Sequence, residues 1–135
     1  MIQSIFGTLL ASSLLCVSAS AGTLRVAHPE RSGEVLLQTE RAAAEGSTAL
    51  EFTTALLQEK GIAFRQVGTY LVSIAGYEPK VDSFDGWCYA LNGVVPNVPA
   101  DEVILPVDAS FLVEWFWGTP TESADGSWTC VPTIY

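Results

Sequence analysis

The ten residues FDGWCYALNG, residues 84–93, place a turn, a short aromatic strand and a second turn in direct succession. The pair Asn92-Gly93 is typical of a tight turn between strands. Side chains alternate between the two faces of a strand, so Trp87 and Tyr89 share one face and Cys88 lies on the other. We expect this segment to be a central strand of a sheet, with Trp87 packed in the core.

The segment STALEFTTALLQEKG, residues 47–61, is the one stretch with a helical period. Thr48 followed three residues later by Glu51 forms a capping box, and Gly61 supplies a left-handed stop. Its apolar residues form a stripe that can cover one face of a sheet: Ala49, Leu50, Phe52, Leu56 and Leu57. The sequence therefore predicts a helix over residues 48–60.

The rest of the chain reads as short strands separated by turns. Apolar or alternating runs occur at residues 23–29, 33–40, 62–67, 69–76, 87–93, 110–118 and 127–131. Three prolines break residues 94–109 and exclude a long central strand there. A hairpin, one helix and several further strands indicate an α+β protein. We expect a small β-grasp-like mixed sheet packed on a single helix.

The first residues predict export. IFGTLLASSLLCVSASAG, residues 5–22, is an apolar run that ends in an A-x-A cleavage site at residues 19–21. The run is shorter than the roughly 20 residues that span a bilayer. Residues 1–21 are therefore predicted to be a signal peptide, and residues 22–135 a single mature domain that is secreted or periplasmic. Lipidation of Cys16 is the alternative, although Leu15 before it is bulkier than a lipobox prefers.

Cleavage of the signal peptide leaves two of the three cysteines, Cys88 and Cys130. Disulfides form and persist in exported proteins. We expect these two residues to form a disulfide that joins the strand at residues 87–93 to the edge strand at residues 127–131. The alternative is a pair of buried free thiols.

The charge of the protein excludes several classes of partner. Fifteen acidic residues against six basic ones give a net charge of −9, which disfavours nucleic acid and anionic membranes. The single histidine, His28, has no recognisable catalytic partner and fits a turn residue better than a metal ligand. Asp82 and Asp85 do not have the spacing of a calcium loop. We therefore expect no catalytic residues and no metal site.

Three separated motifs occur in an order that resembles the transcobalamin-like C-terminal domain of many exported bacterial proteins. The motifs are a G-W-x-Y-x-x-N-G strand, an I-x-G strand end and a closing E-W pair, here Gly86, Trp87, Tyr89, Asn92, Gly93, Ile74, Gly76, Glu114 and Trp115. The resemblance is strongest over residues 47–118. It departs from the family at residues 107–110, where VDAS replaces the usual D-G-D.

This resemblance implies a binding function. In the animal cobalamin carriers, the similar domain closes over one face of a corrin ring that a separate helical domain holds. We expect no such helical domain here, so cobalamin binding would use half a site or need a partner. The resemblance thus implies an exported, non-catalytic binding module for a corrinoid-type ligand. The alternative is a surface module that meets another exported protein through exposed aromatics and a sheet edge.

Five residues are the candidate ligand contacts. Tyr70 and Tyr89 each carry a hydroxyl that must find a partner or water, and Trp128 in the polar tail is the best candidate for an exposed indole. The turn Asn92-Gly93 is placed at the rim of the same site. Trp87, Trp115 and Trp117 are assigned to the core, with the wall of a cofactor site as the alternative.

Overall fold

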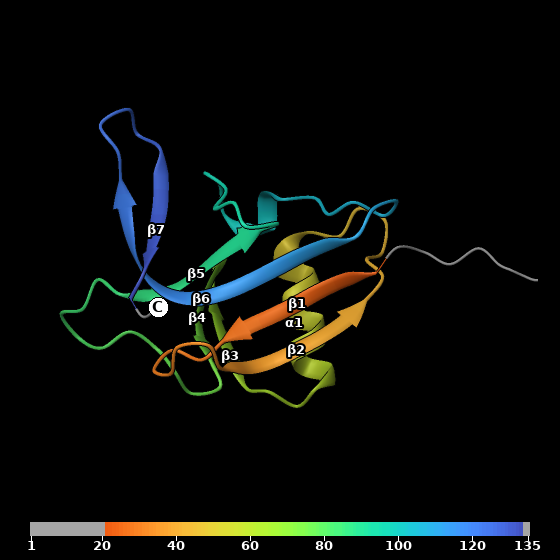
Figure 1. Ribbon diagram of the computed structural model, residues 1–135, viewed down its shortest axis with the longest axis horizontal. Coiled ribbons are helices and arrows are strands. Elements are labelled where there is room, and N and C mark those ends of the chain that lie inside the picture. Colours follow the sequence, from red (N-terminus) through yellow and green to blue (C-terminus); the bar gives the residue numbers. More distant parts are fainter. Residues whose placement is uncertain (1–20, 134–135) are drawn as a thin grey trace, which may run out of the picture.

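Seven strands and one α-helix follow one another in residues 21–133, the part of the chain that the computed structural model describes (Figure 1). In order they are β1 (Gly22–Ala27), β2 (Val35–Arg41), α1 (Ala49–Glu59), β3 (Phe64–Val67), β4 (Tyr70–Ile74), β5 (Gly86–Leu91), the 3-10 helix η3 (Ala100–Glu102), β6 (Phe111–Glu122) and β7 (Trp128–Pro132). Residues 1–20 of the predicted signal peptide lie outside the described residues. No helix among residues 21–133 is both long and apolar enough to span a bilayer.

Helix α1 begins and ends as its sequence predicts. The Glu51 amide donates to Thr48 Oγ1 at 3.1 Å, and Glu51 Oε1 accepts from the Thr48 amide at 3.0 Å. This reciprocal pair satisfies two amides that lack partners within the first turn. The helix ends before Gly61, which has φ +72°. The predicted helix is confirmed, and its apolar stripe is buried.

The main sheet has five strands in the order β2-β1-β6-β5, with β7 paired to the far part of β6. Strand β1 is antiparallel to β2 and parallel to β6, and β6 is antiparallel to both β5 and β7. Strands β3 and β4 form a separate two-stranded sheet. The expected α+β class is confirmed.

The expectation that the aromatic strand is central in the sheet is wrong. Within the described residues β5 pairs only with β6, so it is an edge strand, and β6 lies between β1 and β5. Side-chain alternation is the same in a central and an edge strand, so the pattern around Trp87 could not separate the two. The prolines at residues 96 and 99 lack the amide hydrogen that a further strand beside β5 would need.

The core lies between α1 and one face of the sheet. Phe111, Val113 and Trp115 of β6 are buried on that face, as their alternation with Glu114 predicts. Phe111 packs edge to face against Phe52 of α1, with ring centroids 5.0 Å apart. Glu114, on the opposite face, lies 3.4 Å from Arg25. The central strand β6 therefore contacts the helix directly through Phe111.

The β6–β7 hairpin projects away from the sheet (Figure 1). Gly118 lies in β6 where this hairpin begins, and a Cβ added there would be 2.6 Å from Cys130 Sγ and 2.8 Å from the Val131 carbonyl oxygen. Only glycine therefore lets β7 approach β6 so closely.

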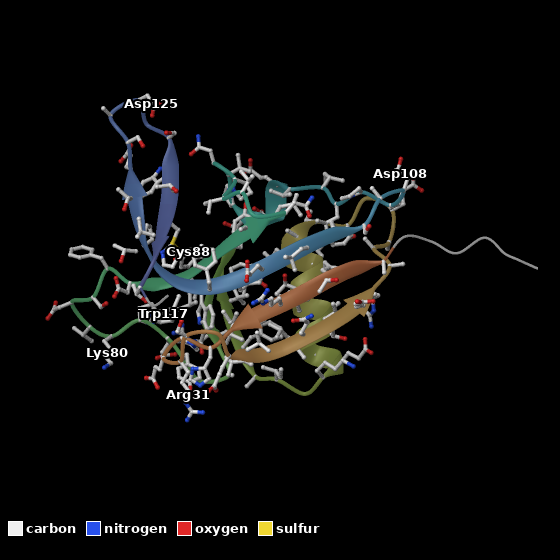
Figure 2. All side chains as sticks on the ribbon, viewed as in Figure 1. Arg31, Lys80, Cys88, Asp108, Trp117 and Asp125 are labelled. Atoms are coloured by element: carbon white, nitrogen blue, oxygen red, sulfur yellow. A yellow bond between two sulfur atoms is a disulfide. The ribbon has the colours of Figure 1, made fainter. Side chains whose placement is uncertain are left out.

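The predicted disulfide is present: Cys88 of β5 and Cys130 of β7 are bonded, with Cα atoms 6.4 Å apart, at the base of the hairpin (Figure 2).

Candidate binding pocket

A pocket of about 460 Å³ lies where β5, the loop at residues 95–100 and the β6–β7 hairpin meet. This volume is within the usual range for small-molecule sites. We call it the aromatic pocket, because its lining includes Tyr70, Trp87, Tyr89, Trp115, Trp128, Pro96, Pro99 and Pro120. The disulfide between Cys88 and Cys130 also contributes to the lining. Segments far apart in the sequence therefore build one concave apolar surface.

Two hydrogen bonds hold the proline-containing loop in place as a wall of the pocket. The Tyr89 hydroxyl donates to the Val98 carbonyl oxygen and ties the loop to β5. The Trp128 amide donates to Asn97 Oδ1 at 2.8 Å and ties the loop to the hairpin. Together with the disulfide, which joins β5 to β7, these contacts connect all three sides of the pocket.

Two indoles in the pocket lining are held by hydrogen bonds to residues outside the lining. Trp115 Nε1 donates to Thr53 Oγ1 in α1 at 2.9 Å, and Trp87 Nε1 donates to the Tyr77 carbonyl oxygen at 2.8 Å. Neither Thr53 nor Tyr77 lines the pocket. Trp128 differs, because 48% of its surface is exposed. The pocket therefore combines rigid indoles with one accessible indole at its edge.

Among the residues that the structure describes, no Asp, Glu, Lys, Arg or His side chain lines the aromatic pocket. Acidic residues begin immediately beyond it, at Asp101 and Glu102, which follow the lining residue Ala100. Burial of the hydroxyl, and then the negative charges of Asp101 and Glu102, raise the pKa of Tyr89 to about 12. Burial also raises the pKa of Tyr70. Both hydroxyls are therefore neutral at physiological pH.

The sequence pattern of the family described as "Domain of unknown function (DUF4430)" matches residues 46–116, more than half of the chain. The chain belongs to this family. Since the family is associated with transcobalamin-like domains, the resemblance expected from the sequence is confirmed. The matched segment of this DUF4430 protein includes α1, β5 and the proline-containing wall of the pocket.

Two solved structures are similar to this DUF4430 protein. "Haptocorrin in Complex with Cbi" aligns with a TM-score of 0.55 and 16% identity over 78% of this chain and 27% of that chain, so the protein spans about a quarter of haptocorrin's length. A "putative metal binding protein from Ruminococcus gnavus" aligns with a TM-score of 0.44 and 15% identity over 73% of this chain and 98% of that one. No curated protein matches the sequence. At these identities the likeness to haptocorrin concerns the fold.

The structure brings together part of the predicted site. Tyr70, Tyr89 and Trp128 all line the aromatic pocket of this DUF4430 protein, whereas Asn92 and Gly93 are not among the lining residues. Asn92 has φ 51°, and its Oδ1 accepts from the Leu112 amide at 2.8 Å. This contact fastens the end of β5 to the start of β6. The structure therefore gives Asn92 a part in the turn.

Sequence reasoning missed two parts of the pocket. Trp115 was assigned to the core in preference to a site wall, yet it is both buried and part of the lining, because β5 and β6 place it directly opposite Tyr89. The proline-containing loop was read only as a break between strands. A signal for its role was present in Asn97 and the flanking prolines, since such a segment has a restricted backbone that suits a fixed wall.

A second hollow of about 330 Å³ has a different character. It is lined by Glu30, Glu78, Lys80 and Asp85 together with uncharged residues. Nearby, His28 Nδ1 accepts from the Glu30 amide at 3.0 Å, as expected of a turn residue. In residues 21–133 no three His, Cys, Asp or Glu side chains gather as metal ligands. The aromatic pocket is therefore the better candidate for a binding site.

The raised pKa of Tyr89 makes stability depend on pH in the alkaline range. The folded protein keeps the Tyr89 proton between pH 10 and about 12, while the unfolded chain loses it. The free energy of unfolding is therefore expected to fall as the pH rises through this window. Tyr89→Phe should reduce the decrease in the free energy of unfolding with pH. Part of the decrease should remain, because the pKa of Tyr70 is also raised. Urea unfolding of both proteins across the window measures the effect, and equal slopes would contradict it.

Proposed function

We propose that this protein is an exported, non-catalytic binding module that holds a small ligand in the aromatic pocket. The observation that carries this proposal is a pocket of about 460 Å³ whose lining is aromatic and proline-rich and, within residues 21–133, includes no charged side chain. Such a lining gains free energy by removing apolar ligand surface from water, and its described residues include no carboxylate, imidazole, amine or free thiol for acid–base or nucleophilic chemistry. Of the five residues that the sequence suggested as ligand contacts, we propose that Tyr70, Tyr89 and Trp128 contact the ligand. Asn92 and Gly93 form the turn after β5.

A corrinoid is the ligand to test first. The family resemblance implies it, and haptocorrin, which has a similar fold over part of its chain, was crystallised in complex with Cbi. A corrin macrocycle is wide compared with the aromatic pocket. We therefore propose that it lies across the mouth of the pocket against Trp128, with a substituent inside, and that a helical partner completes the site.

A titration with cobinamide and cobalamin tests this proposal. Binding is expected to shift the corrin absorption spectrum and quench tryptophan fluorescence. Trp128→Ala should weaken binding about fivefold, as expected for the loss of one aromatic contact, without lowering the melting temperature. Phe84→Ala is the matched control, because Phe84 is 88% exposed and does not line the pocket. Unchanged spectra at millimolar corrinoid would contradict the corrinoid assignment.

A protein-interaction module is the second candidate. In the described residues β7 pairs only with β6, so its other edge is open, and Trp128 and Val131 on this strand are each 48% exposed. An exported partner could add a strand to this edge. The titration separates the two candidates, since an interaction module would leave the corrin spectrum unchanged and would retain a protein partner in affinity capture.

We also propose that the exported protein is a single domain of residues 22–135 with a β-grasp arrangement. The strand order β2-β1-β6-β5, with a parallel β1–β6 pair at its centre and α1 across one face, supports the β-grasp.

The A-x-A site at residues 19–21 and the disulfide support export and cleavage. Intact-mass measurement of the exported protein should give a chain that begins at Gly22; a chain that retains Met1 would contradict cleavage.

A further inference from the structure

The aromatic pocket presents ring surfaces more than hydrogen-bonding groups. The polar atoms of Trp87, Tyr89 and Trp115 all donate to protein acceptors: the Tyr77 carbonyl, the Val98 carbonyl and Thr53 Oγ1. A neutral polar ligand group would therefore find few free donors at the base of the pocket. Aromatic rings carry negative charge density on their faces, and these faces attract organic cations.

Two acidic residues directly follow the lining residue Ala100. Asp101 and Glu102 continue the wall beyond Ala100, close enough to Tyr89 to act on its hydroxyl. Asp101 Oδ1 is buried and has no hydrogen-bond partner among the described residues. Within residues 21–133, no basic residue lines the pocket.

The basic side chains lie on other surfaces. Four arginines are paired with glutamates outside the lining: Arg25, Arg31, Arg41 and Arg65. Lys60 follows the end of α1, and Lys80 lines the second hollow. All six basic residues of the protein are thus accounted for outside the lining of the aromatic pocket.

We infer that the aromatic pocket selects ligands that carry an organic cation, a quaternary or protonated amine on an apolar body, over neutral and anionic ligands of the same shape. This inference rests on the proposed function, because it concerns the same pocket. The rings attract the cation at short range, and Asp101 and Glu102 add an attraction that salt screens. A carboxylate or phosphate meets repulsion from the same two acids.

Three small probes of nearly equal shape test the inference. Choline, 3,3-dimethylbutan-1-ol and 3,3-dimethylbutanoate carry a positive, a neutral and a negative charge on a similar branched body. Each is titrated into the intact mature protein while the indole N–H signals are followed by NMR. Choline is expected to bind at least about fivefold more tightly than the alcohol at low salt, and the carboxylate most weakly. The preference should shrink as the salt concentration rises.

Charge variants identify the source of the preference. Asp101→Asn combined with Glu102→Gln should reduce the preference for choline at least twofold and leave the affinity for the alcohol unchanged. Glu45→Gln combined with Asp108→Asn is the matched control, because it removes the same charge from exposed residues outside the lining (Asp108 in Figure 2). The NMR spectrum of each variant reports whether it is folded.

The outcomes separate this inference from the proposed function. The charge selection is overturned if the alcohol binds as tightly as choline. It is also overturned if the control variant lowers the preference for choline as much as the Asp101 and Glu102 variant does. In either case the proposal that the pocket binds an apolar ligand is retained. If none of the three probes shifts an indole signal in the folded protein, the charge selection is overturned, and the corrinoid titration alone decides whether the aromatic pocket binds a ligand.

Discussion

Trp87→Ala is expected to lower the free energy of unfolding by about 3–5 kcal/mol, the cost of deleting a large buried aromatic side chain. Trp87 is only 2% exposed and is among the largest fully enclosed side chains. Its ring packs edge to face against Trp117, with centroids 5.4 Å apart, and its indole N–H satisfies the Tyr77 carbonyl oxygen. Alanine would leave a cavity and remove one of the two hydrogen bonds that the Tyr77 carbonyl oxygen accepts, the other coming from the Ile74 amide.

Urea unfolding followed by far-UV circular dichroism measures this loss. Trp128→Ala is the matched control: it removes the same side chain from β7, where 48% of the residue is exposed, and should change the free energy of unfolding far less. A Trp87→Ala protein that unfolds like wild type but no longer binds the ligand would show that Trp87 serves the site and not the core.

Loss of the disulfide is expected to have the second largest effect. Cys88 and Cys130 are separated by 42 residues, and the chain-entropy model gives about 3–4 kcal/mol for a loop of this length. The double variant Cys88→Ala/Cys130→Ala should lose a comparable free energy of unfolding. The loss should concentrate in the β6–β7 hairpin, because the disulfide is its covalent link to β5.

Hydrogen exchange distinguishes this local effect from a general one. In the double variant, the amides of β7 should exchange faster by a larger factor than those of α1, and the Trp128 amide should lose its protection by Asn97. A reducing agent should destabilise the wild type and leave the double variant unchanged. Equal stability of the wild type with and without reductant would contradict the prediction.

Local signals in the sequence were sufficient for the helix and for the individual strands. The side chains of Thr48 and Glu51 accept hydrogen bonds from each other's amides within one turn. The start of α1 is therefore determined by neighbouring residues. Alternation in a strand is equally local, which is why the burial of Trp87 and of the β6 residues Val113 and Trp115 was predictable. The cysteine pair could be predicted because removal of the predicted signal peptide would leave two cysteines.

Strand order and the pocket depend on contacts between distant segments. Nothing near Trp87 specifies that β6 inserts between β1 and β5, because both strands of a pair show the same alternation. The turn at Asn92 was placed near Tyr70 and Tyr89 by sequence proximity to β5, yet its side chain bonds to Leu112 of β6. The pocket requires β5, the loop around Asn97 and the hairpin to meet.

The sequence by itself thus determined where α1 begins and ends, which faces of β5 and β6 are apolar, and which cysteines pair. These features follow from interactions within a few residues, or from elimination in the case of the disulfide. Only the tertiary structure decided that β5 lies at an edge, that Trp115 serves both core and pocket, and that Asn97 joins the loop to Trp128. The physical reason is that these contacts form only after the chain has folded, between side chains whose separation no local pattern encodes.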